Sequence, residues 1–294
     1  MNLPAVQEDS GLAGGGDTPV VVARVRRAQG PRPLRLLLLH GLASSSQVWQ
    51  PVLPLLAPEY EVWTADLPWR GAGVPGWPQR PPDTWIDQAV RQLPGNGADV
   101  IVAHSFAANG TLAWLDRCGW GVTSYRPHGH MPRGVVLAAP FYRAAAEHFD
   151  WDTISYYLNH FDRILQHGVR VRSGSRLSDE IEHDMALKVR DRIGCHGWMR
   201  FFDSYLATPA LRTERMRLPF VVIGGSEDFA AFPRDAHALG EALPEADVHI
   251  LAGAGHFTMA ERPRTFADLT NSLIRTVSAR NEADDHNPAM EYKA

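Results

Sequence analysis

Val100-Ile101-Val102-Ala103-His104-Ser105-Phe106-Ala107-Ala108 is an apolar run that ends at a hydroxyl flanked by small residues. The run predicts a buried strand over residues 99–103, a tight turn, and a helix that begins near Phe106. Such a turn pushes the serine oxygen out of the end of the sheet and leaves the next backbone N–H free to face it. Ser105 is therefore a predicted nucleophile, and it needs a base beside it because an isolated serine hydroxyl reacts poorly.

Short apolar runs of this kind alternate with helical patterns along the 294-residue chain. Several are continuous β-branched or leucine-rich runs, which are typical of strands covered on both faces of a parallel sheet. Strands are predicted at 19–24, 34–39, 61–65, 99–103, 134–138, 220–223 and 248–251. Helices are predicted to begin near Ser45, Thr84, Phe106 and Pro233, and a last helix to cover 263–277. The alternation predicts an α/β fold with a mostly parallel central sheet and helices on both faces.

The stretch from 141 to 217 interrupts this alternation, because it has no clear buried strand but many aromatic and amphipathic positions. An insertion directly after a strand overhangs the sheet edge where ligands bind, so this stretch is predicted to form a helical cap over a core of residues 18–140 and 218–278. A simpler interpretation is that its aromatic side chains only pack the insertion onto the core. Residues 1–17 are predicted to form a flexible leader and residues 279–294 a flexible tail.

Composition excludes several classes of protein. The formal net charge of -4 and the sequence pI near 6.3 give no electrostatic reason to expect binding to nucleic acid or to an anionic membrane. No stretch of eighteen or more apolar residues and no basic apolar leader occur, so we expect a cytoplasmic protein that does not enter the membrane. Cys118 and Cys195 are the two cysteines, and their spacing supports neither a disulfide framework nor a structural zinc site.

Three histidines are candidates for a catalytic or metal-binding role. His256 follows a predicted strand and the small residues Gly253-Ala254-Gly255, which let an imidazole reach the end of the sheet. A single histidine is more often structural, but this position favours a general base that takes the serine proton and returns it to the leaving group. His128 and His130 lie one residue apart in a predicted loop. Because no carboxylate or thiol cluster accompanies them, we expect a surface loop and no metal site.

Four motifs, in the order in which they occur along the chain, resemble the α/β-hydrolase superfamily over residues 20–277, and in particular its serine esterases and thioesterases with a helical cap. One is the elbow around Ser105. The others are a strand that ends in His40-Gly41-Leu42, a turn that begins at Asp66, and the pair of strand exits that carry Asp228 and His256. The family usually has glycine two residues before and after the serine. This chain has Ala103 and Ala107 there, so its turn is expected to close with some strain.

The resemblance assigns further roles. It implies that Asp228 orients the base, because the family's acid follows its strand at the offset of Gly225-Ser226-Glu227-Asp228. Glu227 is the competing carboxylate. The backbone N–H groups of Leu42 and Phe106 would form the oxyanion hole, with Gly41 allowing the loop to approach the ligand closely.

The neighbouring polar residues are given structural roles. His40 is expected to hold its loop by hydrogen bonding, and His104 to be a packed or hydrogen-bonded neighbour of the nucleophile. Asp66 and Arg70 are expected to brace the turn that follows their strand. None of these four side chains is expected to take part in the chemistry.

The implied activity is hydrolysis of a small-molecule carboxylic ester, lactone or thioester through an acyl-enzyme on Ser105, without cofactor or metal. The aromatic cap favours a substrate with an apolar acyl part. Haloperoxidases without cofactor and hydrolases of carbon–carbon bonds share this machinery, and so do acyltransferases, lyases and cyclases. A protein that binds ligands on this scaffold without catalysis is a further alternative. Oligomeric state cannot be derived from these residues.

Overall fold

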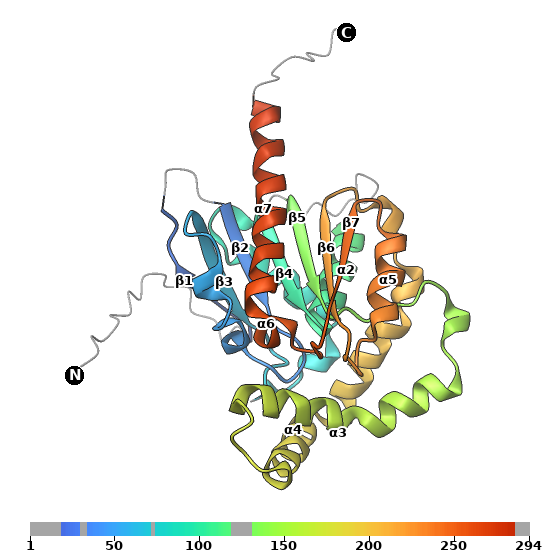
Figure 1. The fold of residues 1–294 in the computed structure, drawn as a ribbon. Coiled ribbons are helices and arrows are strands. Elements are labelled where there is room, and N and C mark those ends of the chain that lie inside the picture. Colours follow the sequence, from blue (N-terminus) through green and yellow to red (C-terminus); the bar gives the residue numbers. More distant parts are fainter. Residues whose placement is uncertain (1–18, 30–33, 72–73, 119–130, 286–294) are drawn as a thin grey trace, which may run out of the picture.

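A computed structural model describes residues 19–29, 34–71, 74–118 and 131–285, and its ribbon is drawn in Figure 1. Within these residues seven strands form one sheet in the order β1-β3-β2-β4-β5-β6-β7. The strands are β1 (Val21–Arg26), β2 (Leu34–Leu39), β3 (Tyr60–Asp66), β4 (Val100–His104), β5 (Gly134–Ala138), β6 (Phe220–Gly225) and β7 (Ala246–Leu251). β1 pairs antiparallel with β3, and the other pairs are parallel. The predicted strands and the mostly parallel sheet are confirmed.

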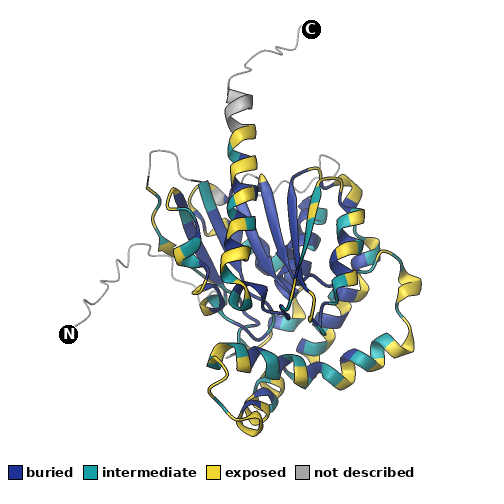
Figure 2. Ribbon diagram, in the orientation of Figure 1, coloured by how far each residue is buried: buried dark blue, intermediate teal, exposed yellow. Residues whose placement is uncertain are grey.

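Helices cover both faces of the sheet because the side chains of each strand alternate between two apolar cores. On one face, strand residues such as Leu37 and Ile101 pack with α1 (Pro82–Arg91), α2 (Phe106–Cys118) and α5 (Pro233–Ala242). On the other face, Leu36 and Val102 pack with α7 (Pro263–Asp285). Figure 2 shows the central strands β4, β5 and β6 buried between these layers, while the edge strands β1 and β7 and the outer helix surfaces are partly exposed. Continuous apolar strands are what such two-sided burial requires.

Two of the predicted helices differ from the structure. The segment at Ser45 forms a short 3-10 helix, Ser46–Trp49, in which Val48 and Trp49 are buried. No α-helix forms between β2 and β3, all of whose connecting residues are described. The last helix does not end at Val277 but continues to Asp285, eight residues further. The apolar stripe that packs on the sheet ends near Val277. The residues beyond it, which include Ala279 and Arg280, favour helix by their intrinsic propensity, and Arg280 pairs with Glu245 at 2.9 Å.

The stretch between β5 and β6 contains two long helices, α3 (Trp151–Ser173) and α4 (Asp179–Leu206), which pack against each other. Figure 1 shows both lying across one end of the sheet. Asp150 caps the start of α3 by accepting a hydrogen bond from the Thr153 N–H, and Gly174 ends it in the left-handed conformation. The helical insertion of the predicted fold is confirmed. A short helix, α6 (Thr258–Glu261), precedes α7.

Some of the predictions lie outside the described residues. These are the flexible leader at 1–17, the part of the predicted tail from 286 to 294, and the loop with His128 and His130. None of the helices in the described part of the chain could span a bilayer, since none carries a sufficiently long apolar run.

Candidate active site

Ser105 occupies a strained turn between β4 and α2. Its φ is 55°, in the left-handed region that costs a residue with a side chain on the order of 1–2 kcal/mol. The turn is held on both sides, because the Ser105 N–H donates to the Ala138 carbonyl at 2.8 Å and the Ser105 carbonyl accepts from the Ala108 N–H at 2.8 Å. Ala103 and Ala107, which stand where the family usually has glycine, are completely buried. The turn therefore closes with both methyl groups packed inside the core.

Gly41 brings a second loop against this turn. A Cβ added at Gly41 would lie 2.9 Å from the Ser105 Cβ and 3.0 Å from the His104 Nδ1, closer than side-chain carbons normally approach. Glycine at this position therefore lets the loop after β2 pass directly over the serine. The following residue, Leu42, lines the same cavity as Ser105.

A chain of hydrogen bonds links the three side chains that the sequence predicts to act together. The Ser105 Oγ lies 2.9 Å from the His256 Nε2, and the His256 Nδ1 lies 2.8 Å from the Asp228 Oδ2. All three residues are buried, although they follow three different strands, β4, β6 and β7. In this arrangement the Nδ1 proton is donated to the carboxylate, which leaves the Nε2 lone pair facing the serine hydroxyl.

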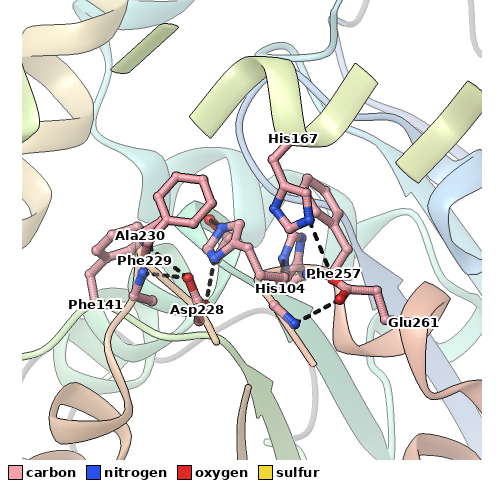
Figure 3. Close-up of polar contacts among 12 residues, drawn as sticks. His104, Phe141, His167, Asp228, Phe229, Ala230, Phe257 and Glu261 are labelled. Atoms are coloured by element: carbon pink, nitrogen blue, oxygen red, sulfur yellow. Dashed lines mark hydrogen bonds and ion pairs between the residues drawn. The ribbon is translucent and has the colours of Figure 1, made fainter. Parts of the chain in front are cut away.

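The two candidate acids have different surroundings. The Asp228 Oδ2 faces the His256 ring, and Figure 3 shows the carboxylate beside Phe229 and Ala230, the residues that follow it. Its Oδ1 accepts hydrogen bonds from the N–H groups of Ala230 at 2.8 Å and Ala231 at 3.0 Å, so both oxygens have donors. Glu227 is exposed, and no contact with His256 is recorded for it. The structure thus brings Asp228, and not Glu227, to the imidazole.

His40 and His104 take the structural positions expected of them. The His40 Nε2 accepts a hydrogen bond from the Leu67 N–H at 2.9 Å, and its Nδ1 donates to the Gly41 carbonyl at 2.8 Å. Burial lowers the pKa of His40 to about 4, so the ring is neutral in this role. The His104 Nε2 donates to the carbonyl of His256 at 2.9 Å, and burial holds the pKa of His104 well below its usual value. The His104 ring therefore holds the backbone of His256 in place.

Asp66 and Arg70 brace their turn through backbone groups and not through each other. The Asp66 Oδ1 accepts a hydrogen bond from the Ser46 N–H at 2.8 Å, and the Arg70 Nη1 donates to the Pro19 carbonyl at 2.9 Å. These bonds tie the turn after β3 to the loop after β2 and to the start of β1.

The two residues that carry the proposed oxyanion donors differ in where their side chains lie. Leu42 lines the cavity, whereas the Phe106 side chain turns away from it and packs edge-on against Trp69, with ring centroids 4.8 Å apart. Phe106 is the first residue of α2, where a backbone N–H has no partner within the helix. Among the described residues, no hydrogen bond from either N–H to a protein acceptor is recorded.

A cavity of about 40 Å³ lies over Ser105 and His256, between the sheet edge and the two inserted helices. Its walls are mainly apolar and come from α3, α4 and the loops that follow β2, β5 and β7. They comprise Leu42, Ala43, His104, Phe141, Phe161, Ile164, Leu165, Gly168, Arg172, Val189, Phe201 and Phe257, together with the two polar residues at its floor. The only arginine or lysine among these lining residues is Arg172.

Glu261 and His167 lie close to His256, and neither stands out in the sequence. The Glu261 Oε2 accepts the Gly255 N–H at 2.7 Å and its Oε1 accepts the Phe257 N–H at 2.9 Å, so one carboxylate holds the backbone on both sides of His256. The Nε2 of His167, on α3, lies 3.7 Å from the same carboxylate (Figure 3). Burial lowers the pKa of His167, which favours its neutral form. A carboxylate five residues after the base is the only sequence signal for this brace.

Metal ligands do not converge anywhere in the described part of the chain, where no three His, Cys, Asp or Glu side chains form a group that could hold an ion.

Comparisons with known proteins agree with this architecture. Residues 36–269 match the model of the alpha/beta hydrolase family. The (R)-3-hydroxydecanoyl-ACP:CoA transacylase of Pseudomonas aeruginosa is 22% identical over 253 residues, which cover 81% of this chain and 80% of the transacylase.

Among solved structures, a bromoperoxidase from Bacillus anthracis superposes with a TM-score of 0.60 at 17% identity, covering 87% of this chain and 95% of the other. A thermophilic esterase from Thermogutta terrifontis superposes with a TM-score of 0.58 at 18% identity, covering 88% and 93%. At such identities these structures show a shared fold. Because the family model spans most of the sheet and all four motifs, the chain belongs to the alpha/beta hydrolase family.

Proposed function

We propose that the protein is a serine hydrolase that cleaves a small carboxylic ester, lactone or thioester through an acyl-enzyme on Ser105. The observation that carries the proposal is the continuous hydrogen-bonded chain from the Ser105 Oγ through the His256 ring to the Asp228 carboxylate, at the floor of an apolar cavity. A hydroxyl, a base and an orienting acid in this order are the requirement for nucleophilic acyl transfer.

In the proposed reaction, the His256 Nε2 takes the Ser105 proton as the Oγ attacks the carbonyl carbon. The C–O or C–S bond to the leaving group then breaks, and His256 protonates that group as it departs. Water repeats the sequence on the acyl-enzyme and releases the acid. Asp228 stays ionised throughout and stabilises the imidazolium. The N–H groups of Leu42 and Phe106 are the proposed donors to the oxyanion, each worth about 3 kcal/mol of transition-state stabilisation.

We further propose that residues 141–217 act as a cap that moves to admit substrate. The cavity volume of about 40 Å³ is far below the roughly 150 Å³ that holds a benzene molecule in an engineered apolar cavity. Anything larger than a few atoms therefore requires α3 and α4 to shift away from the sheet edge. The apolar walls that these helices contribute favour a substrate with an apolar acyl part.

Acyl transfer to an acceptor other than water is the second candidate. It is favoured by the likeness to a transacylase over four-fifths of the chain. Hydrolysis and transfer share the acyl-enzyme and differ in what resolves it, so the experiment must supply both water and an alcohol or thiol.

The test is labelling with a fluorophosphonate, followed by a panel of esters, thioesters and lactones of varied acyl length with and without an acceptor. We expect label on the wild type and on Ser155→Ala, a control at an exposed serine of α3, and none on Ser105→Ala. Label that persisted on Ser105→Ala, or turnover that survived complete labelling, would refute the acyl-enzyme. Acylated acceptor in place of free acid would select the transferase.

The choice of acid gives a separate expectation. Asn at position 228 would offer an amide N–H to the His256 Nδ1 and favour the tautomer whose Nε2 carries the proton, so Asp228→Asn should lower kcat by about 10⁴-fold. Glu227→Gln, next to it but exposed, is the matched control and should stay within about threefold of wild type, as surface changes usually do. Steady-state kinetics on the best ester decide it. A larger loss in Glu227→Gln would show that the acid is wrongly assigned.

A further inference from the structure

Arg172 is a cation in an otherwise apolar cavity. It is lined from α3 by residues at spacings of three and four, which share one face of the helix: Phe161, Ile164, Leu165, Gly168 and Arg172. Arg172 continues this face at its C-terminal end. At 1.5 Å per residue it lies about 16 Å along the axis from Phe161 and about 6 Å from Gly168.

The contacts of α3 show where Arg172 lies relative to the loops that carry His256 and Leu42. Gly168 faces Phe257, the residue after the base, since a Cβ added there would lie 3.0 Å from the Phe257 Cζ. The Arg172 Nη1 donates to the carbonyl of Ala43 at 3.2 Å, and Ala43 follows the proposed oxyanion donor Leu42. Along α3 the cavity therefore runs from an apolar end at Phe161, past Gly168 beside Phe257, to a cationic end at Arg172 beside the proposed oxyanion loop, and Ser105 is among its lining residues.

Arg172 is exposed, and it has fewer protein partners than the less exposed Arg26 and Arg143. Arg26, whose pKa is also lowered by burial, donates to the carbonyls of Leu53, Leu56 and Ala57. Arg143 lies 3.4 Å from the buried carboxylate of Asp235. For Arg172 the one recorded hydrogen bond in the described part of the chain is that to Ala43, and no ion pair is recorded there.

Among the residues that the structure describes, those that line the cavity also leave Arg172 without a counter-ion. No aspartate or glutamate is among the described lining residues, and the burial that lowers the pKa of His104 keeps that ring from adding a second positive charge. Burial also lowers the pKa of Arg172, although its side chain keeps solvent contact, as expected of a cation in a concave opening. A guanidinium with spare donors in such an opening is suited to bind a carboxylate through two parallel hydrogen bonds.

We infer that Arg172 binds a carboxylate of the substrate, so that the substrate is an ester or thioester with an apolar group on one side of the reacting carbonyl and a carboxylate on the other. The inference deepens the proposed function and rests on it. One guanidinium matches the single charge of a carboxylate, whereas a phosphate dianion would leave excess negative charge in an apolar site. The carboxylate belongs either to the acyl half or to the leaving group.

Two matched pairs of substrates separate these sources. Monobutyl succinate and butyl succinamate differ by a carboxylate or a neutral amide on the acyl half. Butyryloxyacetate and butyryloxyacetamide differ in the same way on the leaving group. In one pair we expect the carboxylate to be preferred by about 10- to 100-fold in kcat/KM, as for a hydrogen-bonded charge pair. Arg172→Gln should bring the ratio close to one, and Arg172→Lys should keep part of it.

Arg176→Gln is the control, since it removes a nearby charge that does not line the cavity and should leave the ratio unchanged. Ratios near one in both pairs for the wild type would overturn the inference. So would equal losses for both members of a pair in Arg172→Gln, because Arg172 would then act by holding the Ala43 loop. A stronger preference for 2-butyryloxyethyl phosphate would overturn the choice of carboxylate.

Calorimetric binding to Ser105→Ala, with and without Arg172→Gln, separates this inference from the proposed function. If the wild type turned over no ester but Ser105→Ala bound the carboxylate member more tightly, and Arg172→Gln removed that preference, the proposed hydrolase function would be refuted and the carboxylate site supported. Turnover of esters without any preference for the carboxylate member would support the hydrolase and refute the carboxylate site.

Discussion

Replacing Ser105 by alanine is expected to lower kcat by on the order of 10⁶-fold, the largest loss that any single change in this chain should cause. The change removes the atom that attacks the carbonyl and leaves His256 and Asp228 paired as before. The fold should survive, because Ser105 makes its turn through backbone hydrogen bonds that alanine retains. Single-turnover and steady-state rates on the best substrate measure the loss.

Two observations would count against this expectation. Residual activity within about tenfold of wild type would mean that another group attacks the substrate. A loss of activity together with a loss of binding would point to a damaged fold, and calorimetry of the unreacted substrate with Ser105→Ala distinguishes that case.

Removing the base should be almost as damaging. His256→Ala is expected to lower kcat by a similar factor, on the order of 10⁶, because the hydroxyl then has no acceptor at 2.9 Å for its proton. The two residues act as one unit, so the double variant Ser105→Ala/His256→Ala should be no slower than either single variant. Additive losses in the double variant would show that the two groups act independently.

His249 provides the matched control for this experiment. It lies on β7, the strand that leads to His256, and its Nε2 pairs with Asp247 at the surface. His249→Ala should keep wild-type turnover. If it lost activity as His256→Ala does, the loss would belong to the strand and not to the base.

Much of the architecture could be predicted from local pattern. Continuous apolar runs such as Leu36–Leu39 and Val100–Val102 predict strands because both their faces must be buried. The segment at Ser45 could not be predicted in the same way. It is amphipathic like a helix, but only a 3-10 turn forms there, and the loop it belongs to is tied to the next strand by the bond from the Ser46 N–H to Asp66. Tertiary contacts of that kind override a weak helical preference.

The candidate site, too, could be predicted from the sequence only in part. The order of motifs along the chain predicts which strand exits carry Ser105, Asp228 and His256. The choice between Asp228 and Glu227 depends on which of two adjacent side chains turns inwards, and only the packed structure decides that. His167 and Arg172 could not be singled out beforehand, because each acquires its role from a neighbour far along the chain. Glu261 acts on the nearby Gly255 and Phe257 N–H groups, but only the folded loop shows that its carboxylate turns back to them.

The sequence by itself determined the strands, their mostly parallel arrangement and the identity of the residues that follow them at one end of the sheet, since burial imposes a periodicity that a linear pattern records. Only the tertiary structure decided the distances between those residues, the partners of each carboxylate and the position of the Arg172 guanidinium beside the loop that follows β2. Hydrogen bonds and ion pairs depend on distances of a few ångströms and on the direction between the groups. A linear sequence pattern contains neither these distances nor these directions.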